Sequence, residues 1–425
     1  MRLSSLAGHA LELIEILQRD SRPADHIIDT FFRQRRYLGS HDRRELAESV
    51  YGILRHLRLL QAFVAKVKPD AISHPAWLFA TYKLHFEKVS PTTLQAYSLP
   101  LLPTEISALA TLDFAGFGLQ DLGLRTSFPD WLVATLQRQL GESETERLLE
   151  ALNQPPPLTI RVNTLKATHE ACLVELQRRG YDCTPTNLSP DGIHLAKRTN
   201  LFGLDLFRDG WFELQDEGSQ IISLLLDPKP NWRLADVCAG GGGKTLHLAA
   251  LMKNHGEIFA FDVVPQRLEN LRKRARRCGI HNIRVQHLQP DAVPANLLGK
   301  MDVILIDAPC SGTGVLRRNP DAKWKITLKM VQEMAVKQKE IINHYALLLK
   351  PGGRLVYATC SLLAEENEEV VQSFLAQHPE FRPADAAAIL QRYQLTHLAN
   401  HSFLHLFPHQ HGTDGFFAAI LERVP

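Results

Sequence analysis

Residues 233–251 have the sequence RLADVCAGGGGKTLHLAAL, and this stretch decides the fold. It begins with a short apolar run that predicts a buried strand and ends with a run that predicts a helix. Between them lie four consecutive glycines, Gly240 to Gly243, followed by Lys244. Glycine lets a backbone approach a ligand closely, and the N-terminus of the next helix favours negative charge. The stretch therefore predicts a ligand-binding turn at the end of a strand.

Short apolar runs alternate with helical stretches after this turn. The predicted strands are EIFAFD, IRVQH, MDVILID and RLVYATC, at 257–262, 283–287, 301–307 and 354–360. Such alternation is typical of βαβ units around a parallel sheet that is buried on both faces. The tail at 403–424 predicts two more strands around a turn at Gly412–Gly415, which would form an antiparallel edge. The predicted fold class is α/β, with a mostly parallel Rossmann-like sheet.

The first part of the chain has a different pattern, because its apolar residues recur at helical spacing to about residue 150. The breaker Asn153-Gln-Pro-Pro-Pro157 then ends the helices. Beyond it, LTIRVNT predicts a strand and THEACLVELQRRG a helix, as in a small α+β module. We therefore predict an all-α domain, a small α+β module and a parallel-sheet domain, at 1–145, 146–228 and 229–425.

Composition excludes several classes of protein. The 425 residues are 45% hydrophobic and 22% charged, with a net charge of +2, so disorder is not the dominant state. No run of ~18 apolar residues is present that could span a membrane, and the start lacks a signal-peptide core. A cytoplasmic protein is expected. The overall charge does not by itself indicate nucleic-acid binding, which a basic stripe would mark.

The glycine turn suits three ligand classes. A P-loop needs a glycine where Cys238 stands, and a dinucleotide motif needs one where Thr245 stands. The next strand ends in Asp262, whose carboxylate can accept ribose hydroxyls. That arrangement also suits S-adenosylmethionine, which has a ribose and no phosphate. The turn alone does not choose among these ligands.

Two cysteines follow the ends of neighbouring predicted strands. MDVILID leads into Asp307-Ala-Pro-Cys310, and RLVYAT leads into Cys360. Because ligands of open α/β sheets bind at the carboxyl ends of the strands, Asp262, Asp307 and the two cysteines should converge on one crevice. No Cys/His cluster has zinc-site spacing, so no metal is predicted. Packing roles are predicted for the other cysteines, Cys172, Cys183, Cys238 and Cys278.

The motifs Asp307-Ala-Pro-Cys310-Ser-Gly-Thr-Gly314 and Thr359-Cys360-Ser361 resemble those of the RsmB/NOP2/Sun family of RNA 5-methylcytosine methyltransferases. The resemblance covers roughly residues 150–425 and implies a class I Rossmann-like methyltransferase fold there. The helical part before it is similar, more loosely, to the NusB-like RNA-binding domain of bacterial 16S rRNA methyltransferases. Further matching motifs are Arg161-Val-Asn-Thr164, Gln215-Asp-Glu-Gly-Ser-Gln220 and Asp414-Gly-Phe-Phe417.

The resemblance implies methylation of cytosine C5 in RNA through a covalent adduct. Cytosine C5 is a poor nucleophile until a thiolate adds to C6 and makes an enamine-like intermediate. By motif position, Cys360 is the nucleophile and Cys310 assists resolution or product release. Asp307 hydrogen-bonds the N3/N4 edge of the base and favours charge uptake. The target base must be unpaired or flipped out of its stack.

The resemblance also implies a binding site for the cofactor S-adenosylmethionine. The glycine turn wraps the methionine part, Asp262 holds the ribose, and Asp291 meets the adenine amino group. The family usually has Cys-Ala-Ala-Pro-Gly-Gly-Lys in this turn, so glycine replaces its proline and predicts a looser cofactor site. The full predicted set is Cys238, Ala239, Gly240, Gly241, Gly242, Gly243, Lys244, Asp262, Arg267, Asp291 and Asp307.

Two basic clusters are present in this part of the chain. One lies along a predicted helix and is predicted to be a solvated face: Arg267, Arg272, Lys273, Arg274, Arg276 and Arg277. The other follows the Cys310 loop and is predicted to provide phosphate contacts and a stacking aromatic: Arg317, Arg318, Lys323, Trp324 and Lys325.

The expected partner is RNA, with 16S rRNA as the first expectation and tRNA as the alternative. The chain is expected to be a monomer that binds no membrane. A non-catalytic RNA-binding ribosome-assembly factor is disfavoured, because both cysteines and the acidic residues are present. In a DNA cytosine methyltransferase the Pro-Cys motif supplies the nucleophile, which would make Cys310 the attacking thiol. Amine methylation is disfavoured, since Asp-Ala-Pro-Cys replaces the Asn/Asp-Pro-Pro-aromatic motif.

Overall fold

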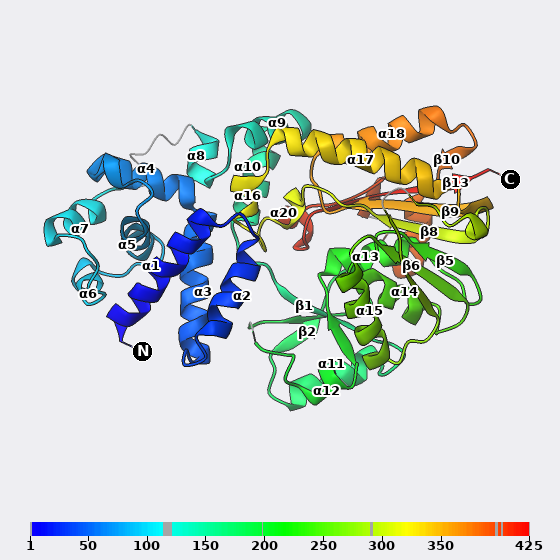
Figure 1. Cartoon of the computed structure of the whole chain (residues 1–425), viewed down its shortest axis with the longest axis horizontal. Helices are drawn as coiled ribbons and strands as arrows, with labels where there is room; N and C mark the ends of the chain where they lie inside the picture. The colour runs from blue at the N-terminus through cyan, green and yellow to red at the C-terminus, as the bar shows by residue number, and fades with distance from the viewer. Residues whose placement is uncertain are drawn as a thin grey trace. The chain divides into compact units, whose positions relative to one another are not determined.

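The computed structural model describes residues 2–113, 121–197, 199–289, 292–395, 398–400 and 403–424. The chain folds as two compact units, which Figure 1 draws together in one view. The helical unit consists of Met1–Pro155 and Leu316–Ile326, and the sheet unit of Pro156–Val315 and Thr327–Pro425. The small module and the large sheet thus lie in one unit, and the boundaries of the three predicted domains stay a prediction.

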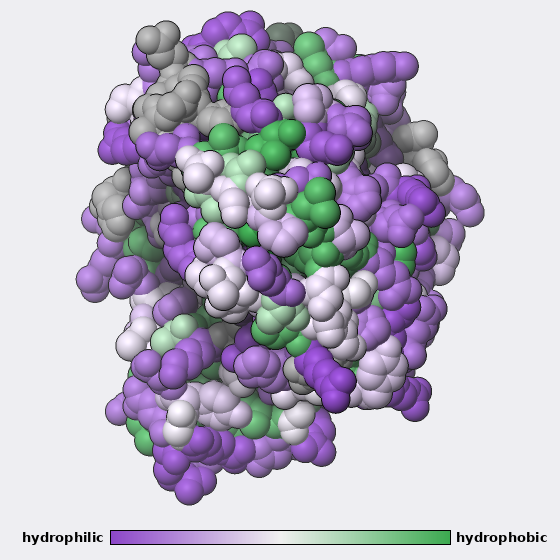
Figure 2. All heavy atoms as spheres, turned by 90° about the vertical axis from the view of Figure 1, so that its left-hand side faces the viewer, coloured by the Kyte–Doolittle hydropathy of each residue, from purple (hydrophilic) through white to green (hydrophobic). Residues whose placement is uncertain are grey.

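The helical unit is built around one apolar core. Leu13 of α1, Val50 of α3 and Leu78 of α5 are fully buried there, as helical spacing predicts. Hydrophilic side chains cover most of the face seen in Figure 2, and apolar ones gather in small groups. The helices are α1 Leu3–Arg19, α2 Ala24–Gln34, α3 Ser40–Arg55, α4 Leu57–Val67, η1 Pro69–Ala71, α5 Pro75–His85, α6 Pro91–Gln95, α7 Pro103–Ala110, α8 Leu122–Thr126, α9 Asp130–Leu140, α10 Glu142–Leu152 and α16 Ala322–Lys325.

The sheet unit begins with a small antiparallel sheet of order β2-β3-β1-β4. Ile160 and Phe212 on its strands and Leu176 on α11 are fully buried in a core of their own. The strand and helix predicted after the proline run are confirmed. The elements are β1 Leu158–Val162, α11 His169–Arg178, β2 Cys183–Pro185, β3 Gly192–Leu195, α12 Asp205–Arg208 and β4 Phe212–Leu214.

The large sheet has the order β11-β12-β13-β9-β8-β5-β6-β7, and β10 also pairs with β13. Its central strands from β9 to β7 are parallel, and β13 and β12 continue it in antiparallel pairing. This confirms the predicted α/β class. The strands are β5 Arg233–Asp236, β6 Glu257–Asp262, β7 Ile283–His287, β8 Met301–Asp307, β9 Leu349–Thr359, β10 Phe381–Pro383, β11 Ala399–Asn400, β12 Phe403–Leu406 and β13 Phe416–Arg423.

Helices cover both faces of the large sheet (Figure 1). α13, α14 and α15 pack on one face, and α17 and α18 pack on the other. Burial on both faces explains why the parallel strands are almost continuously apolar. The helices are α13 Glu217–Leu225, α14 Gly243–Leu251, α15 Pro265–Arg277, η3 Ala295–Leu297, η4 Thr313–Val315, α17 Leu328–Ala346, η5 Ala364–Glu366, α18 Glu368–Gln377, α19 Ala386–Leu390, η6 Gln391–Tyr393 and α20 Pro408–His411.

The two strands predicted in the tail are present as β12 and β13, with α20 in the connection between them. Since β13 lies between β12 and β9, it is an interior strand of the sheet, and the tail extends the sheet beyond it. Within the parts of the chain that the structure describes, none of the helices combines the length and the apolar character needed to cross a membrane.

Candidate active site

The structure brings the two strand-end cysteines together. Cys310 follows β8 and Cys360 directly follows β9, and these strands are parallel neighbours. The Sγ atoms of Cys310 and Cys360 are 3.4 Å apart, within hydrogen-bond distance for sulfur. The hydrogen bond with Cys360 and burial both raise the pKa of Cys310. Cys310 is therefore held as a thiol beside the second sulfur.

A buried carboxylate lies behind both cysteine loops. Glu366, on η5, accepts hydrogen bonds from the backbone N–H of Ser311 at 2.7 Å and from the hydroxyl of Ser361 at 2.5 Å. The side-chain amide of Gln338 on α17 donates to it at 3.1 Å. Glu366 is fully buried and fixes the residues that follow each cysteine. This role is not visible in the sequence, because nothing in the acidic run from Glu365 to Glu369 distinguishes one glutamate from the others.

Three of the quoted motifs meet at Gly314. Its N–H donates to the carbonyl of Cys360 at 2.9 Å, and the N–H of Gly415 donates to the carbonyl of Gly314 at 2.9 Å. A Cβ at position 314 would lie 2.3 Å from the Gly415 oxygen and 2.8 Å from the Cys360 oxygen. Only glycine allows this approach, so the last glycine of the Cys310 motif sets the distance between the loops.

An ion pair lies beside the cysteines. The Nζ atom of Lys244, at the start of α14, is 2.6 Å from Oδ2 of Asp307, at the end of β8. Burial alone would lower the pKa of Lys244, but the Asp307 carboxylate outweighs it and the net direction is upward. Negative charge on Cys360 raises the pKa of Lys244 further, so the ammonium lies within electrostatic reach of that sulfur.

The glycine turn is held against the ends of β5 and β6. The N–H of Gly240 donates to Oδ2 of Asp262 at 2.9 Å, and the N–H of Ala239 donates to the Phe261 carbonyl at 2.9 Å. Gly242 has φ +86°, and a Cβ there would lie 2.1 Å from Leu271 on α15. Only glycine fits at this position, because both the conformation and the space exclude a side chain.

Asp236, at the end of β5, is a second site residue that was not predicted from the sequence. Its Oδ2 accepts the Thr245 hydroxyl at 2.7 Å, while Oδ1 is buried with no hydrogen-bond partner among the described residues. Burial raises the pKa of Asp236 to about 7. The sequence does show a carboxylate at the end of the strand before the glycine turn, and this position could have indicated a role in the site.

The structure also places two other residues predicted to bind the cofactor. Nη1 of Arg267 is 4.0 Å from Oδ2 of Asp262, and the Arg267 side chain is 61% exposed. Cys238 lies at the start of the turn, and burial raises the pKa of its thiol. Asp291 lies outside the described residues.

Comparisons with known proteins agree with this geometry. The model described as 16S rRNA methyltransferase RsmB/F matches residues 223–422, and the RsmF/B-like ferredoxin-like domain matches residues 128–201. A protein described as a probable ribosomal RNA small subunit methyltransferase B from Synechocystis is 32% identical over 97% of this chain and 98% of its own length. Ribosomal RNA small subunit methyltransferase B of Pectobacterium carotovorum is 31% identical over 91% of this chain and 92% of its own.

This chain belongs to the RsmB/F family. The family resemblance inferred from the motifs is confirmed. The crystal structure of PH0851 matches 100% of the RsmB/F chain and 99% of its own, with TM-score 0.80 and 27% identity. A methyltransferase homolog protein from Pyrococcus horikoshii matches 74% of the RsmB/F chain and 100% of its own, with TM-score 0.62 and 29% identity.

The RsmB/F chain is an RNA methyltransferase whose cofactor is S-adenosylmethionine. The residues of the glycine turn fit that cofactor. A Cβ added at Gly240 would meet no atom within 4 Å, so open space lies before the turn. The unpartnered Oδ1 of Asp236 lies at the base of the same turn and can accept from a cationic amino group.

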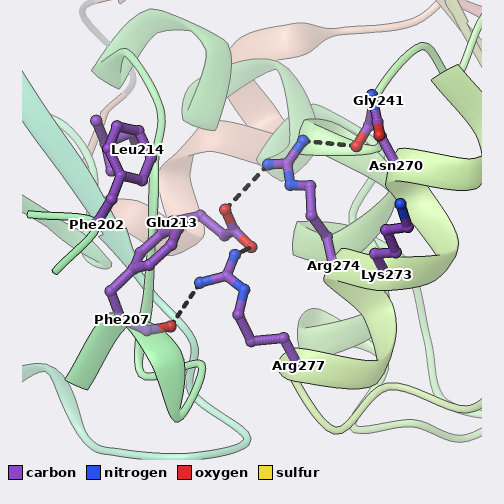
Figure 3. A pocket seen from close by; sticks show the side chains of 9 residues that line it. All are labelled: Phe202, Phe207, Glu213, Leu214, Gly241, Asn270, Lys273, Arg274 and Arg277. Atoms are coloured by element: carbon purple, nitrogen blue, oxygen red, sulfur yellow. Dashed lines mark hydrogen bonds and ion pairs between the residues drawn. The ribbon is translucent and has the colours of Figure 1, made fainter. Parts of the chain in front are cut away.

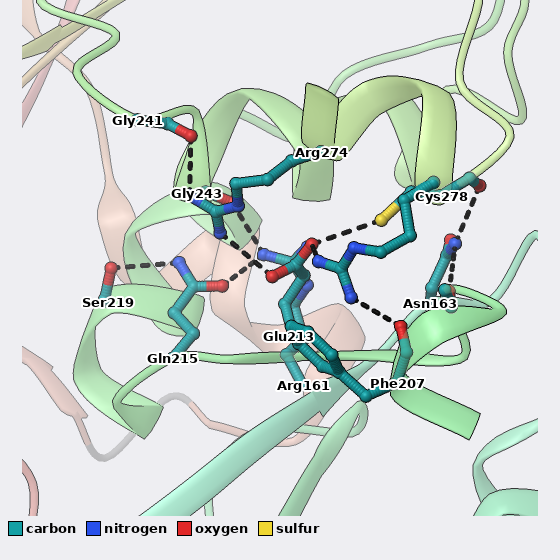
Figure 4. A network of polar contacts seen from close by, with 12 residues as sticks. Arg161, Asn163, Phe207, Glu213, Gln215, Ser219, Gly241, Gly243, Arg274 and Cys278 are labelled. Carbon is teal, nitrogen blue, oxygen red and sulfur yellow. Dashed lines mark hydrogen bonds and ion pairs between the residues drawn. The ribbon is translucent and has the colours of Figure 1, made fainter. Parts of the chain in front are cut away.

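Arginines from two other elements hold this turn (Figure 4). Arg161 of β1 donates to the Gly243 carbonyl at 2.7 Å, and Arg274 of α15 donates to the Gly241 carbonyl. Arg274 and Arg277 share the carboxylate of Glu213 on β4. The prediction that the α15 cluster is a solvated face is therefore wrong for these two arginines, because backbone carbonyls and a buried carboxylate bind them.

The prediction that the second basic cluster contacts phosphate is wrong for Arg317 and Lys323, which are buried, and stays a prediction for Arg318, Trp324 and Lys325. Lys323 is 2% exposed, and its Nζ donates to the Arg55 carbonyl at 2.6 Å and to Asn153 Oδ1 at 3.0 Å. The indole N–H of Trp324 donates to the Leu54 carbonyl at 2.8 Å, and Arg317 is 4% exposed. Lys323 and Trp324 therefore bond to oxygens of the helical unit, and Arg317 is buried within it.

Proposed function

We propose that this chain methylates C5 of cytosine in 16S rRNA through a covalent bond between Cys360 and C6. The observation that carries the proposal is the 3.4 Å separation of the Cys310 and Cys360 sulfurs, beside the Asp307–Lys244 ion pair. A nucleophile with a second thiol at contact distance suits a reaction in which one bond to the base is first made and later broken.

The first half of the reaction makes the base nucleophilic. The Cys360 thiolate adds to C6, and the electron pair of the C5–C6 double bond moves toward C5 and N3. Asp307 hydrogen-bonds the N3/N4 edge and orients the ring, while Lys244 holds the Asp307 carboxylate at 2.6 Å. S-adenosylmethionine, when bound, would supply an electrophilic methyl group for C5, and its sulfur would keep the electron pair of the broken S–CH3 bond.

The second half releases the product. A base removes the proton from C5, the C5–C6 double bond forms again, and the bond between C6 and the Cys360 sulfur breaks. Cys310 assists this step, because its raised pKa keeps a proton beside the departing thiolate. Glu366 holds Ser311 and Ser361, so that both sulfurs keep their separation during the cycle.

The cofactor is assigned to the turn between β5 and α14. Asp236 and the carbonyls and N–H groups of the turn would hold the methionine part, and Asp262 would hold the ribose. Arg267 would neutralise the Asp262 carboxylate, which lies 4.0 Å away. Asp291 is proposed to meet the adenine.

Covalent trapping on RNA that contains 5-azacytidine tests the proposal. The unaltered protein should form an adduct that survives denaturing gels, and Cys360→Ala should form none. Cys310→Ala should retain or accumulate the adduct, because attack is intact and release is slowed. Cys183→Ala is the control, since this thiol is buried in the small sheet. Loss of the adduct in Cys310→Ala with retention in Cys360→Ala would contradict the assignment and favour the DNA-methyltransferase order.

The target base is tested by bisulfite sequencing of rRNA and tRNA from a deletion strain. Loss of one 5-methylcytosine in 16S rRNA is expected, and loss in tRNA alone would favour the tRNA alternative. A protein that binds RNA, forms no adduct and changes no base would be the non-catalytic assembly factor. The monomeric state stays a prediction.

A further inference from the structure

A cavity lies beside the glycine turn, outside the cysteine crevice (Figure 3). Its volume is about 580 Å³, within the ~300–1,000 Å³ range of small-molecule sites. One wall comes from the small sheet and the segment before β4, and the opposite wall from α15. The lining residues are Phe202, Phe207, Glu213, Leu214, Gly241, Asn270, Lys273, Arg274 and Arg277.

The first wall offers an aromatic surface. Phe202 is 60% exposed, which is unusual for a phenylalanine in the described parts of this chain. Its ring meets Phe207 edge to face, with centroids 5.0 Å apart and planes at 86°. The guanidinium of Arg277 lies 3.8 Å above the Phe207 ring and covers it. Phe202 is therefore the aromatic that a planar ligand can reach.

The α15 wall is positively charged. Arg274 and Arg277 share one carboxylate, Glu213, and Lys273 lines the same cavity. Lys273 is exposed and has no hydrogen bond or ion pair with any described residue. Figure 3 shows these basic side chains opposite the aromatic ones. The cavity thus combines an uncompensated cation with an apolar ring.

We propose that this cavity binds one nucleotide of the RNA substrate next to the target base, with the base stacked on Phe202 and its phosphate at Lys273. The pairing of a stacking ring with a cation is the chemistry that recognises unpaired nucleotides. An acidic peptide would satisfy Lys273 but would leave Phe202 unused. The inference rests on the proposed function, because a flipped target base leaves its neighbours unpaired.

The contact of Arg274 with the Gly241 carbonyl links this cavity to the cofactor turn. A nucleotide bound here would lie against Gly241, a residue of the turn that is assigned to S-adenosylmethionine. A strand bound here would be held next to the cofactor turn, and its binding needs no contact with the cysteines.

Binding of a 16S rRNA transcript over a series of salt concentrations tests the inference. Phe202→Leu should weaken binding ~5-fold or more, since a stacked base is lost, and Phe202→Trp should keep the affinity. Lys273→Gln should reduce the slope of log K against log salt by ~0.7, the value for one phosphate of a single strand. Arg276→Gln is the matched control, because it removes one exposed charge from the same helix outside the cavity.

Each of these measurements supports or overturns the inference. Equal effects of Lys273→Gln and Arg276→Gln, or an unchanged affinity in Phe202→Leu, would overturn the nucleotide site and leave general charge attraction or a peptide. Calorimetric titration with S-adenosylmethionine should give the same affinity in Lys273→Gln and the unaltered protein; a loss there would assign the cavity to the cofactor. Trapping on 5-azacytidine RNA is measured in parallel, so that absence of an adduct with the binding effects intact identifies a failure of the proposed function alone.

Discussion

Lys273 of helix α15 and Lys323 of the segment Leu316–Ile326 are the same kind of side chain in opposite surroundings. Lys273 of α15 is exposed and has no charged partner among the described residues. Lys323 of the segment is 2% exposed, bonds to two oxygens, and lies 4.0 Å from the Phe128 ring centroid. The difference shows that a lysine in a basic cluster is available to a ligand only where oxygens and rings of the same fold do not already bind it.

The largest effect on stability is expected at Glu213 of β4, the buried carboxylate that binds two arginines of α15. Glu213→Gln removes the carboxylate that Arg274 and Arg277 share, and should lower the free energy of unfolding by about 3 kcal/mol, as for a buried pair that loses one partner. Urea unfolding measures it. Glu257→Gln is the control, because Glu257 also joins two arginines but is 39% exposed, and it should lose less than ~1 kcal/mol. Equal losses would show that burial does not separate the two carboxylates.

The second prediction concerns pH. Burial, and secondarily the charge of Arg55, lower the pKa of Lys323. The folded unit therefore binds fewer protons than the unfolded chain between the lowered pKa and about pH 10.4, and the free energy of unfolding rises with pH across that window. Each pKa unit of difference contributes ~1.4 kcal/mol. Urea unfolding from pH 7 to pH 10 should show a smaller rise for Lys323→Met, and an identical rise would contradict the burial of the ammonium.

A smaller effect is expected at Trp324. Trp324→Phe keeps the apolar ring and leaves the Leu54 carbonyl without its donor, which should lower the stability of the helical unit by ~1 kcal/mol. Hydrogen exchange of backbone amides resolves which helices open. Trp131→Phe, in the same unit, removes no hydrogen bond to a described residue and should leave exchange unchanged. If the two variants show the same hydrogen exchange, the indole N–H of Trp324 has no structural role.

The smallest effect is expected at Arg276, which is exposed on α15. Arg276→Gln should change the free energy of unfolding by less than ~0.5 kcal/mol, as surface substitutions usually do. Thermal unfolding measures it. A larger loss would mean that the solvated part of α15 contributes to packing, and would weaken the comparison with Lys323.

The fold of the sheet unit can be predicted from the sequence, because buried parallel strands are nearly continuous apolar runs. RLAD, EIFAFD and MDVILID form β5, β6 and β8, and the cysteine loops follow from the direction of β8 and β9. The proximity of Cys310 and Cys360 can thus be predicted from the sequence alone.

Other parts of the site depend on distant partners. Glu366 acts through Ser311 and Ser361, and Arg161 through the Gly243 carbonyl, so neither role is visible in a local pattern. The Nζ atom of Lys323 donates to the carbonyl of Arg55, 268 residues earlier, and to Asn153, 170 residues earlier. Side chains at such separations are chosen by tertiary packing, which periodicity does not encode.

The return of Leu316–Ile326 to the helical unit has a consequence for synthesis on the ribosome. The first 155 residues emerge long before Lys323 and Trp324, which donate hydrogen bonds to the Arg55 and Leu54 carbonyls of that unit. At ~5–20 residues per second, the helices wait on the order of ten seconds or more for that segment. During that interval the Leu54 and Arg55 carbonyls lack their donors, so a nascent chain halted near residue 155 should be the form most open to proteases and most in need of chaperones.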